Sequence, residues 1–289
     1  AMDNLSLMVK YPGYRILREH ITGLLKQSNG LSWPPSNLGL QEQRATRAFL
    51  DEHPEVIALI LRELFSTAPN LSFFEAFVKK VLLDLRIQET EVAIPKTSLR
   101  GEKTIYEGTN CETVRQIEIS VKLQPQDIVY DLGSGYGDFV FLVALTTDVR
   151  RIFGLEFVPE RVKRSKEICE ALRLSQAEFL QKNCRYLTVD DIQDGTVFFL
   201  FNPFDKDVSI HVAQILNELA GKKYIRVVSY GEFYNLPNYF LDGQSSLRQV
   251  YNLPFHSMPF VVYEAKTMRD RQEDGKPVLN ISAGVRQAV

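Results

Sequence analysis

This sequence has few of the residues that mark metal-binding or disulfide-stapled proteins. Only three of its 289 residues are cysteine (Cys111, Cys169 and Cys184), and no two of them form a C-x-x-C pair. An odd number of widely spaced cysteines argues against a disulfide framework and against a zinc site. The four histidines are scattered as well, so we predict no metal-binding residues.

Long apolar runs and an excess of either charge are also missing. No uninterrupted apolar segment reaches the roughly 20 residues that a membrane-spanning helix needs. The first ten residues show no basic stretch followed by an apolar one, so we expect no signal peptide. The formal net charge of −2 gives no electrostatic case for nucleic-acid binding. We therefore expect a cytoplasmic protein without membrane or nucleic-acid partners, and the sequence indicates no oligomeric state.

The chain instead shows two kinds of apolar patterning. Residues 12–90 have the spacing of helices, and we treat 1–100 as an N-terminal helical region of unknown role. From about residue 125, short apolar runs alternate with helical stretches, which predicts a mainly parallel sheet covered by helices on both faces. We expect this α/β domain to span 101–266, with an antiparallel strand pair near its end and a polar tail at 267–289. The expected strands are 127–132, 151–157, 177–181, 196–201, 223–230, 246–253 and 260–266.

Three glycines mark the end of the first expected strand. The stretch V-Y-D-L-G-S-G-Y-G-D-F-V-F contains Gly133, Gly135 and Gly137, and a helix is expected to start at Gly137. A strand that runs through glycines into a helix is typical of nucleotide sites, because the bare backbone admits a ligand near the helix N-terminus. Asp138 stands where the dinucleotide fingerprint G-x-G-x-x-G has its third glycine.

The carboxylate ahead of these glycines distinguishes between ligands. Asp131 would repel a pyrophosphate but attract the ammonium and sulfonium groups of S-adenosylmethionine. Glu156 ends the second strand and could accept hydrogen bonds from both ribose hydroxyls. Asn183 follows the third strand, where its side chain could contact the adenine edge. Taken singly, Glu156 could be a solvated surface residue and Asn183 a turn residue.

These segments resemble the class I, Rossmann-like S-adenosylmethionine-dependent methyltransferases. The resemblance rests on D-L-G-S-G-Y-G, L-E-F, L-Q-K-N and F-N-P-F and covers about residues 100–265. It implies a seven-stranded, mainly parallel sheet and S-adenosylmethionine as the cofactor. Members usually have aspartate where Asn183 stands. The cofactor-binding residues that it implies are Asp131, Gly133, Ser134, Gly135, Gly137, Glu156 and Asn183.

A second, local resemblance precedes the first strand of the sheet. The segment Y-E-G-T-N-C-E-T-V-R-Q-I is similar to the cofactor-covering loop of several methyltransferases, including the non-SET histone lysine methyltransferases. It implies that Tyr106, Thr109 and Glu112 border the methionine end of the cofactor. The alternative is a helix-capping turn at Thr109 or Asn110.

The segment F-N-P-F-D follows the fourth strand. It is a degenerate match to the [DNS]-P-P-[YFW] motif of methyltransferases that act on amines, which implies catalytic roles for Asn202 and Phe204. The alternative is a turn in which Asn202 caps the next helix. Asp205 and Tyr230 are further candidates for polar contacts with a substrate. The basic run R-V-K-R-S-K, residues 161–166, is interpreted as a solvated helix face.

Three functions remain open on the sequence alone. The favoured one is an S-adenosylmethionine-dependent methyltransferase whose unknown acceptor is a nitrogen of a protein side chain or of a small molecule. The second is an NAD-dependent oxidoreductase on a similar sheet, against which Asp131 and the missing third glycine argue. The third is a catalytically silent scaffold that keeps the cofactor pocket.

Overall fold

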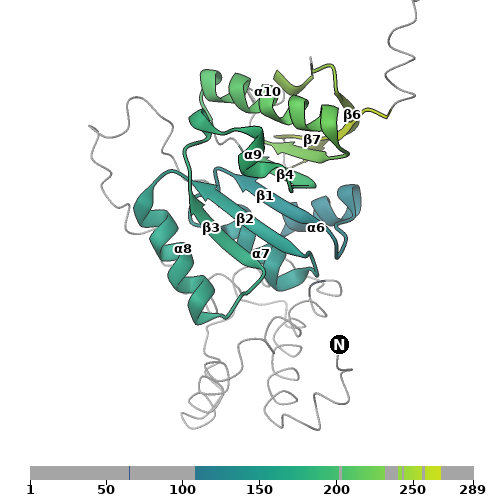
Figure 1. Cartoon of the computed structure of the whole chain (residues 1–289). Helices are drawn as coiled ribbons and strands as arrows, with labels where there is room; N and C mark the ends of the chain where they lie inside the picture. The colour runs from purple at the N-terminus through teal and green to yellow at the C-terminus, as the bar shows by residue number, and fades with distance from the viewer. Residues whose placement is uncertain are drawn as a thin grey trace, which may run out of the picture.

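Seven strands form one sheet at the centre of the described chain (Figure 1). The computed structural model describes Phe65 and residues 108–201, 204–231, 240–242, 244–255 and 258–267. Apart from Phe65, the predicted helical region 1–100 lies outside these residues, as do Tyr106, Asn202 and the predicted tail beyond Thr267.

Helices and strands alternate along the described chain, as the apolar pattern predicts. The strands are β1 (Ile128–Leu132), β2 (Arg151–Glu156), β3 (Ala177–Gln181), β4 (Val197–Phe201), β5 (Arg226–Tyr230), β6 (Leu247–Phe255) and β7 (Met258–Ala265). The helices are α6 (Cys111–Val121), α7 (Asp138–Thr146), α8 (Pro159–Ala171), the short 3-10 helix η4 (Cys184–Tyr186), α9 (Val189–Ile192) and α10 (Lys206–Lys222). Every predicted strand is present, and α9 and η4 are elements that the sequence pattern did not predict.

The strand order confirms the predicted architecture. It runs β3-β2-β1-β4-β5-β7-β6, and the first five strands are parallel. The last two strands are antiparallel to their neighbours, as expected for the edge pair. The chain turns from one side of β1 to the other between β3 and β4. Ligands of open parallel sheets bind at such a switch point, beyond the carboxyl ends of the strands.

Separate hydrophobic clusters fill the two faces of the sheet. One contains the apolar side of α6, residues 139–145 of α7, and Val162 and Ile168 of α8, and all nine residues of α7 are buried. The other contains Leu187, α9 and the buried stripe of α10. Figure 1 shows α10 and α9 on one side of the sheet and α7 and α8 on the other. The complete burial of α7 explains why its sequence is apolar on every side between Asp138 and Thr146.

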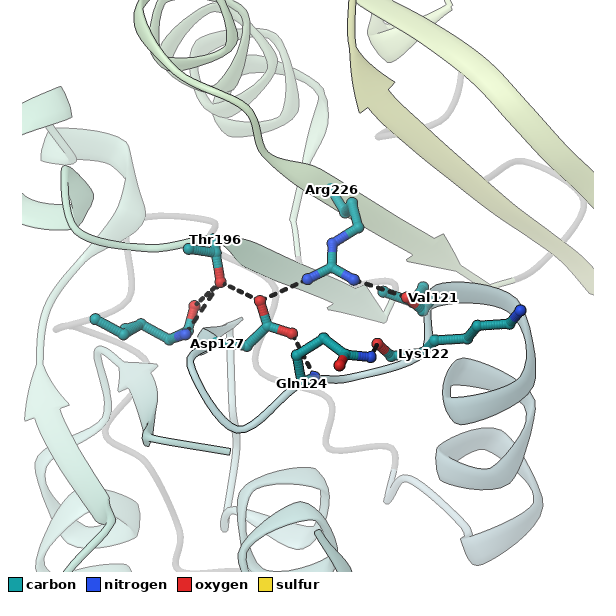
Figure 2. A network of polar contacts seen from close by, with 7 residues as sticks. Val121, Lys122, Gln124, Asp127, Thr196 and Arg226 are labelled. Carbon is teal, nitrogen blue, oxygen red and sulfur yellow. Dashed lines mark hydrogen bonds and ion pairs between the residues drawn. The ribbon is translucent and has the colours of Figure 1, made fainter. Parts of the chain in front are cut away.

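A buried ion pair between Asp127 and Arg226 stabilises the edge of the sheet at the amino ends of the parallel strands, opposite the carboxyl edge (Figure 2). Oδ1 of Asp127 accepts hydrogen bonds from Arg226 at 2.5 Å and from the Thr196 hydroxyl at 2.8 Å. Its Oδ2 accepts from the Gln124 N–H at 2.6 Å, and Arg226 also donates to the Val121 carbonyl at 2.7 Å. These bonds join the end of α6 to the starts of β1, β4 and β5. The polar groups of this edge serve the fold, which leaves the carboxyl edge for a ligand.

Gly154 in β2 provides a test of the packing beneath the glycine turn. A Cβ at this position would lie 2.6 Å from the Phe179 ring and 2.8 Å from Oγ of Ser134. We expect Gly154→Ala to lower the free energy of unfolding by about 1–3 kcal/mol, the usual cost of overpacking a core. Urea unfolding measures this change.

Gly221→Ala is the matched control. Gly221 lies within α10, and a Cβ there would meet only Oγ of Ser246, at 3.5 Å. Because alanine favours helix more than glycine does, we expect this variant to be unchanged or more stable by up to about 1 kcal/mol. Equal destabilisation by both substitutions would contradict the close packing at Gly154.

Candidate active site

The glycine turn between β1 and α7 adopts a conformation that only glycine tolerates well. Gly133, Gly135 and Gly137 have φ angles of 92°, 57° and 89°, all in the left-handed region. The N–H groups of Gly133 and Ser134 both donate to the Leu155 carbonyl at 2.9 Å. The turn is therefore tied to the end of β2, with its backbone at the carboxyl edge of the sheet.

Two members of this turn also have packing roles. A Cβ at Gly137 would come within 2.3 Å of the Phe179 ring, so glycine is required there for space as well as for φ. Oγ of Ser134 is buried without a hydrogen-bond partner among the described residues, and it lies against Gly154 of β2. The Ser134 hydroxyl thus lies beneath the turn. The contact of Ser134 with the cofactor remains a prediction. The backbone of Ser134, rather than its hydroxyl, would make that contact at the carboxyl edge of the sheet.

Asp131 brings a negative charge into the interior directly below the turn. It lies in β1 between Gly154 of β2 and Phe199 of β4, and its side chain is only 4% exposed. Burial raises the pKa of this carboxyl well above its ordinary value, and the neighbouring Glu156 and Asp138 carboxylates raise it further. A carboxylate in such surroundings is stabilised by a cation, which is the charge that an ammonium or sulfonium supplies.

Glu156 organises the loop at the end of β2. Its Oε1 accepts from the N–H groups of Phe157 and Val158 at 2.9 Å, and its Oε2 accepts from the Gly135 N–H at 2.8 Å. A carboxylate offers about four acceptor sites, so this count leaves one on Oε2 for a ribose hydroxyl. Burial raises the pKa of Glu156, although these N–H groups and Arg161 act to lower it.

Arg161 is a site residue that the sequence interpretation missed. The basic run 161–166 was expected to face solvent, but Arg161 is only 7% exposed. Its Nη1 lies 3.7 Å from Oε2 of Glu156, and its guanidinium stands 5.4 Å from the centre of the Tyr136 ring. Ser165, one turn later, donates to the Tyr136 carbonyl at 2.9 Å. Helical spacing places Arg161, Ser165 and Ile168 on one face, and this periodicity was the available signal.

The loop after β3 carries the residue expected to contact adenine. Oδ1 of Asn183 accepts the Arg185 N–H at 2.9 Å and caps η4. The turn role that the sequence left open is therefore present. The predicted adenine contact stays a prediction. Cys184, the next residue, is buried, and burial raises the pKa of its thiol.

The expected cofactor-covering loop leads into a helix. Asn110 is the N-cap of α6, and its Oδ1 accepts from the N–H and the hydroxyl of Thr113, each at 2.8 Å. The capping alternative is thus present, while Thr109, directly before the cap, is 5% exposed. Thr113 is also hydrogen-bonded to Tyr230, and burial raises the pKa of the Tyr230 hydroxyl.

The segment after β4 is described from Phe204 onward. Phe204 is half-buried and packs against the cluster that contains α10. Asp205 is the N-cap of α10 and accepts from the Val208 N–H at 3.0 Å, so Asn202 does not cap this helix. Tyr230 is 2% exposed and stacks on Phe201 with 4.9 Å between ring centres, so it is a core residue.

The described residues fit S-adenosylmethionine better than a dinucleotide. The buried Asp131 calls for a cation, and the glycine turn is tied down by Glu156 through the Gly135 N–H. Over the described ranges, no group of histidine, cysteine or acidic side chains could hold a metal ion. In the same part of the chain, no helix is long and apolar enough to cross a membrane.

A family model matches this chain across the whole of the predicted site. The family is described as histone methylation protein DOT1, and the match covers residues 96–246, just over half of the 289 residues. It therefore includes every predicted site residue from Tyr106 to Phe204. No curated protein sequence matches the chain.

Solved structures of similar fold include three methyltransferases. An RNA methyltransferase from Salinibacter ruber in complex with S-adenosyl-L-homocysteine is 21% identical, with a TM-score of 0.42, over 55% of this chain and 94% of its own. A precorrin-6y C5,15-methyltransferase from Geobacter metallireducens is 15% identical, with a TM-score of 0.41, over 55% and 90%. A putative RNA methyltransferase from Pyrococcus horikoshii is 13% identical, with a TM-score of 0.44, over 66% and 99%.

Proposed function

This chain belongs to the DOT1 family of histone methylation proteins, and from that membership we propose that it methylates the ε-amine of lysine in a basic protein such as a histone. The observation that carries the proposal is that one family match spans both the cofactor turn and the N-P-F segment. The chain is a methyltransferase, and its methyl donor is S-adenosylmethionine. Family membership thus favours this function over the NAD-dependent and scaffold alternatives.

The described residues suggest how the cofactor would be held. When bound, S-adenosylmethionine supplies an electrophilic methyl group on a sulfonium centre. We assign its amino group to Asp131 and its methionine part to the backbone at Gly133 and Gly135, which carries no Cβ. Glu156 offers its remaining acceptor site on Oε2 to a ribose hydroxyl. We assign the contact with adenine to Asn183.

Methyl transfer to an amine requires alignment and a neutral nucleophile. The nitrogen must approach within about 3–3.5 Å of the methyl carbon, in line with the bond that breaks. A lysine amine is protonated in water, so a poorly hydrated site that lowers its pKa would favour the reactive form. The stacked Tyr230 and Phe201 rings supply such apolar surroundings beneath the end of β4. We assign the oxygen of Asn202 to orienting the amine N–H.

Charge at the same edge of the sheet supports a cationic acceptor. Glu112 lies in the first turn of α6, and its charge adds to burial, the main cause, in raising the pKa of the Tyr230 hydroxyl. A negative group beside the acceptor side of the site would attract a lysine side chain and repel a phosphate. This favours a protein amine over a nucleic acid.

The proposal is tested by offering labelled methyl groups to competing acceptors. The full chain is incubated with S-adenosylmethionine labelled in its methyl group and with core histones, RNA or free lysine. We expect label on histone lysines, identified by mass spectrometry. We expect Asn202→Ala to lower kcat roughly 10- to 150-fold, because one hydrogen bond to the reacting amine is lost, with little change in cofactor affinity.

Each competing outcome points to a different acceptor. Label in RNA alone would overturn the protein acceptor, and label on free lysine alone would indicate a small-molecule enzyme. Full activity of Asn202→Ala would remove Asn202 from the reaction without affecting the family assignment.

A further inference from the structure

An ion pair joins two loops at the carboxyl edge of the sheet. In η4, Nη2 of Arg185 lies 3.0 Å from Oδ2 of Asp205. Asp205 is also the N-cap of α10, where its Oδ1 accepts from the Val208 N–H at 3.0 Å. One carboxylate therefore holds the start of α10 with one oxygen and the loop after β3 with the other.

The sheet order shows which strands lie between the two loops that this pair joins. β2 and β1 stand between β3 and β4, and neighbouring strands are about 4.8 Å apart. The pair thus joins loops from either side of the two strands that carry Glu156 and Asp131. A second contact supports the same connection, because Nε2 of His211 in α10 lies 2.8 Å from the Leu187 carbonyl just after η4.

The strength of the pair argues against a mainly stabilising role. The Arg185 and Asp205 side chains are 31% and 34% exposed, and half-exposed pairs of this kind add little to folding stability. The cap on Val208 does not require Arg185 either. The clearest effect of the pair is to fix the position of one loop relative to the other.

We propose that Arg185 is a positioning residue that couples cofactor binding to alignment of the methyl acceptor. Through Asp205 it fixes the residue that directly follows N-P-F relative to the loop that carries Asn183. The inference rests on the proposed function, which assigns adenine to the Asn183 loop and the acceptor amine to N-P-F. Binding at the first loop then restricts the second, which is the coupling of two sites through a shared element.

Hydrogen exchange on the full chain tests this coupling without any acceptor. We expect S-adenosylhomocysteine to slow amide exchange both in the η4 loop and in the first turn of α10. In Asp205→Asn, slowing should be confined to the η4 loop, because asparagine keeps the cap on Val208 but gives Arg185 no charged partner. Arg185→Met removes the other partner of the ion pair and should give the same result.

A control variant on the same helix removes an equal charge. Glu218→Gln breaks the exposed pair between Glu218 and Lys222, which lie 2.6 Å apart near the other end of α10, and should behave like the unchanged protein. Protection of both segments in Asp205→Asn would overturn the coupling. Faster exchange of the α10 turn in ligand-free Asp205→Asn would overturn it too, since Asp205 would then act only as a cap.

Kinetics with core histones separate this inference from the function on which it rests. We expect Arg185→Met and Asp205→Asn to lower kcat by roughly 5- to 150-fold, the usual range of coupling between sites, with an unchanged cofactor KM. Arg185→Lys should recover part of that loss. If the unchanged protein does not methylate histones, the proposed acceptor fails, while the exchange experiment still decides the coupling. A raised cofactor KM with unchanged kcat would overturn it.

Discussion

Asp131→Asn will weaken cofactor binding and stabilise the cofactor-free protein. Asparagine keeps the shape of the side chain but cannot provide a charge for the amino group of S-adenosylmethionine. We expect affinity for S-adenosylhomocysteine, which keeps that amino group, to fall roughly 10- to 150-fold, the usual value of a hydrogen bond to a charged group. Calorimetric titration measures the affinity, and thermal unfolding measures the stability.

The gain in stability follows from the sign of the pKa shift. Burial and two neighbouring carboxylates raise the pKa of Asp131 in the folded protein above its value in the unfolded chain. Such a group contributes stability below its unfolded pKa, and that contribution is lost as pH rises through the folded pKa. Asparagine does not ionise, so the variant should have the higher unfolding temperature at neutral pH and lose this advantage near pH 4.

Cofactor affinity should depend on pH in the opposite direction. The amino group of the ligand favours ionised Asp131, so affinity should increase as pH rises through the raised pKa, and Asp131→Asn should flatten this dependence. Asp190→Asn is the control, because Asp190 is exposed in the first turn of α9 and should affect neither quantity. A variant at Asp131 that binds with unchanged affinity would refute the assignment of this carboxylate to the ligand.

The strands of the sheet could be predicted from the sequence because each one depends on a local pattern. β1, β2, β4 and β5 are largely buried, so each appears as a short, mainly apolar run between helices, whereas the edge strand β3 is only partly buried. The glycine turn was identifiable for the same reason, since its φ angles restrict residue type directly. Asp131 and Glu156 followed from their positions at the ends of the first two strands.

The orientation of side chains near the site was harder to predict from the sequence. Arg161 stands in a basic run whose charge favours a solvated face, and the helical periodicity that places Arg161 with Ser165 and Ile168 was a weaker signal; in the structure Arg161 is buried while Lys163 is exposed. The Ser134 hydroxyl could equally have faced the ligand or the sheet, and it faces the sheet where Gly154 has no side chain to occupy the space. The short elements η4 and α9 are set by caps and by packing on α10, and segments of three or four residues show no period.

Arg161→Met will destabilise the protein because it removes a cation from a buried carboxylate. The guanidinium of Arg161 and the Glu156 carboxylate are 9% and 4% exposed, and methionine preserves much of the apolar contact with Tyr136. Removal of one partner from a buried pair leaves an uncompensated charge, and we expect a loss of about 2–4 kcal/mol in the free energy of unfolding. Urea unfolding at several pH values measures it.

The pH dependence distinguishes this cause from a simple packing defect. Arg161 lowers the pKa of Glu156, so its loss should raise that already elevated pKa further. A raised folded pKa costs stability as pH rises through it, so the penalty of Arg161→Met should be larger at pH 8 than at pH 5. Adding Glu156→Gln to Arg161→Met removes the stranded charge and should flatten this pH dependence.

The control is an exposed ion pair between Arg151 of β2, the strand that also carries Glu156, and Glu178 of β3. Arg151 and Glu178 approach more closely, at 2.6 Å, but their side chains are 46% and 44% exposed. We expect Arg151→Met to cost no more than about 1 kcal/mol and to show no such dependence on pH, because water screens the remaining charge. Equal penalties for the two arginines would mean that the burial of Arg161 beside Glu156 has no energetic consequence, and a penalty independent of pH would assign its role to packing alone.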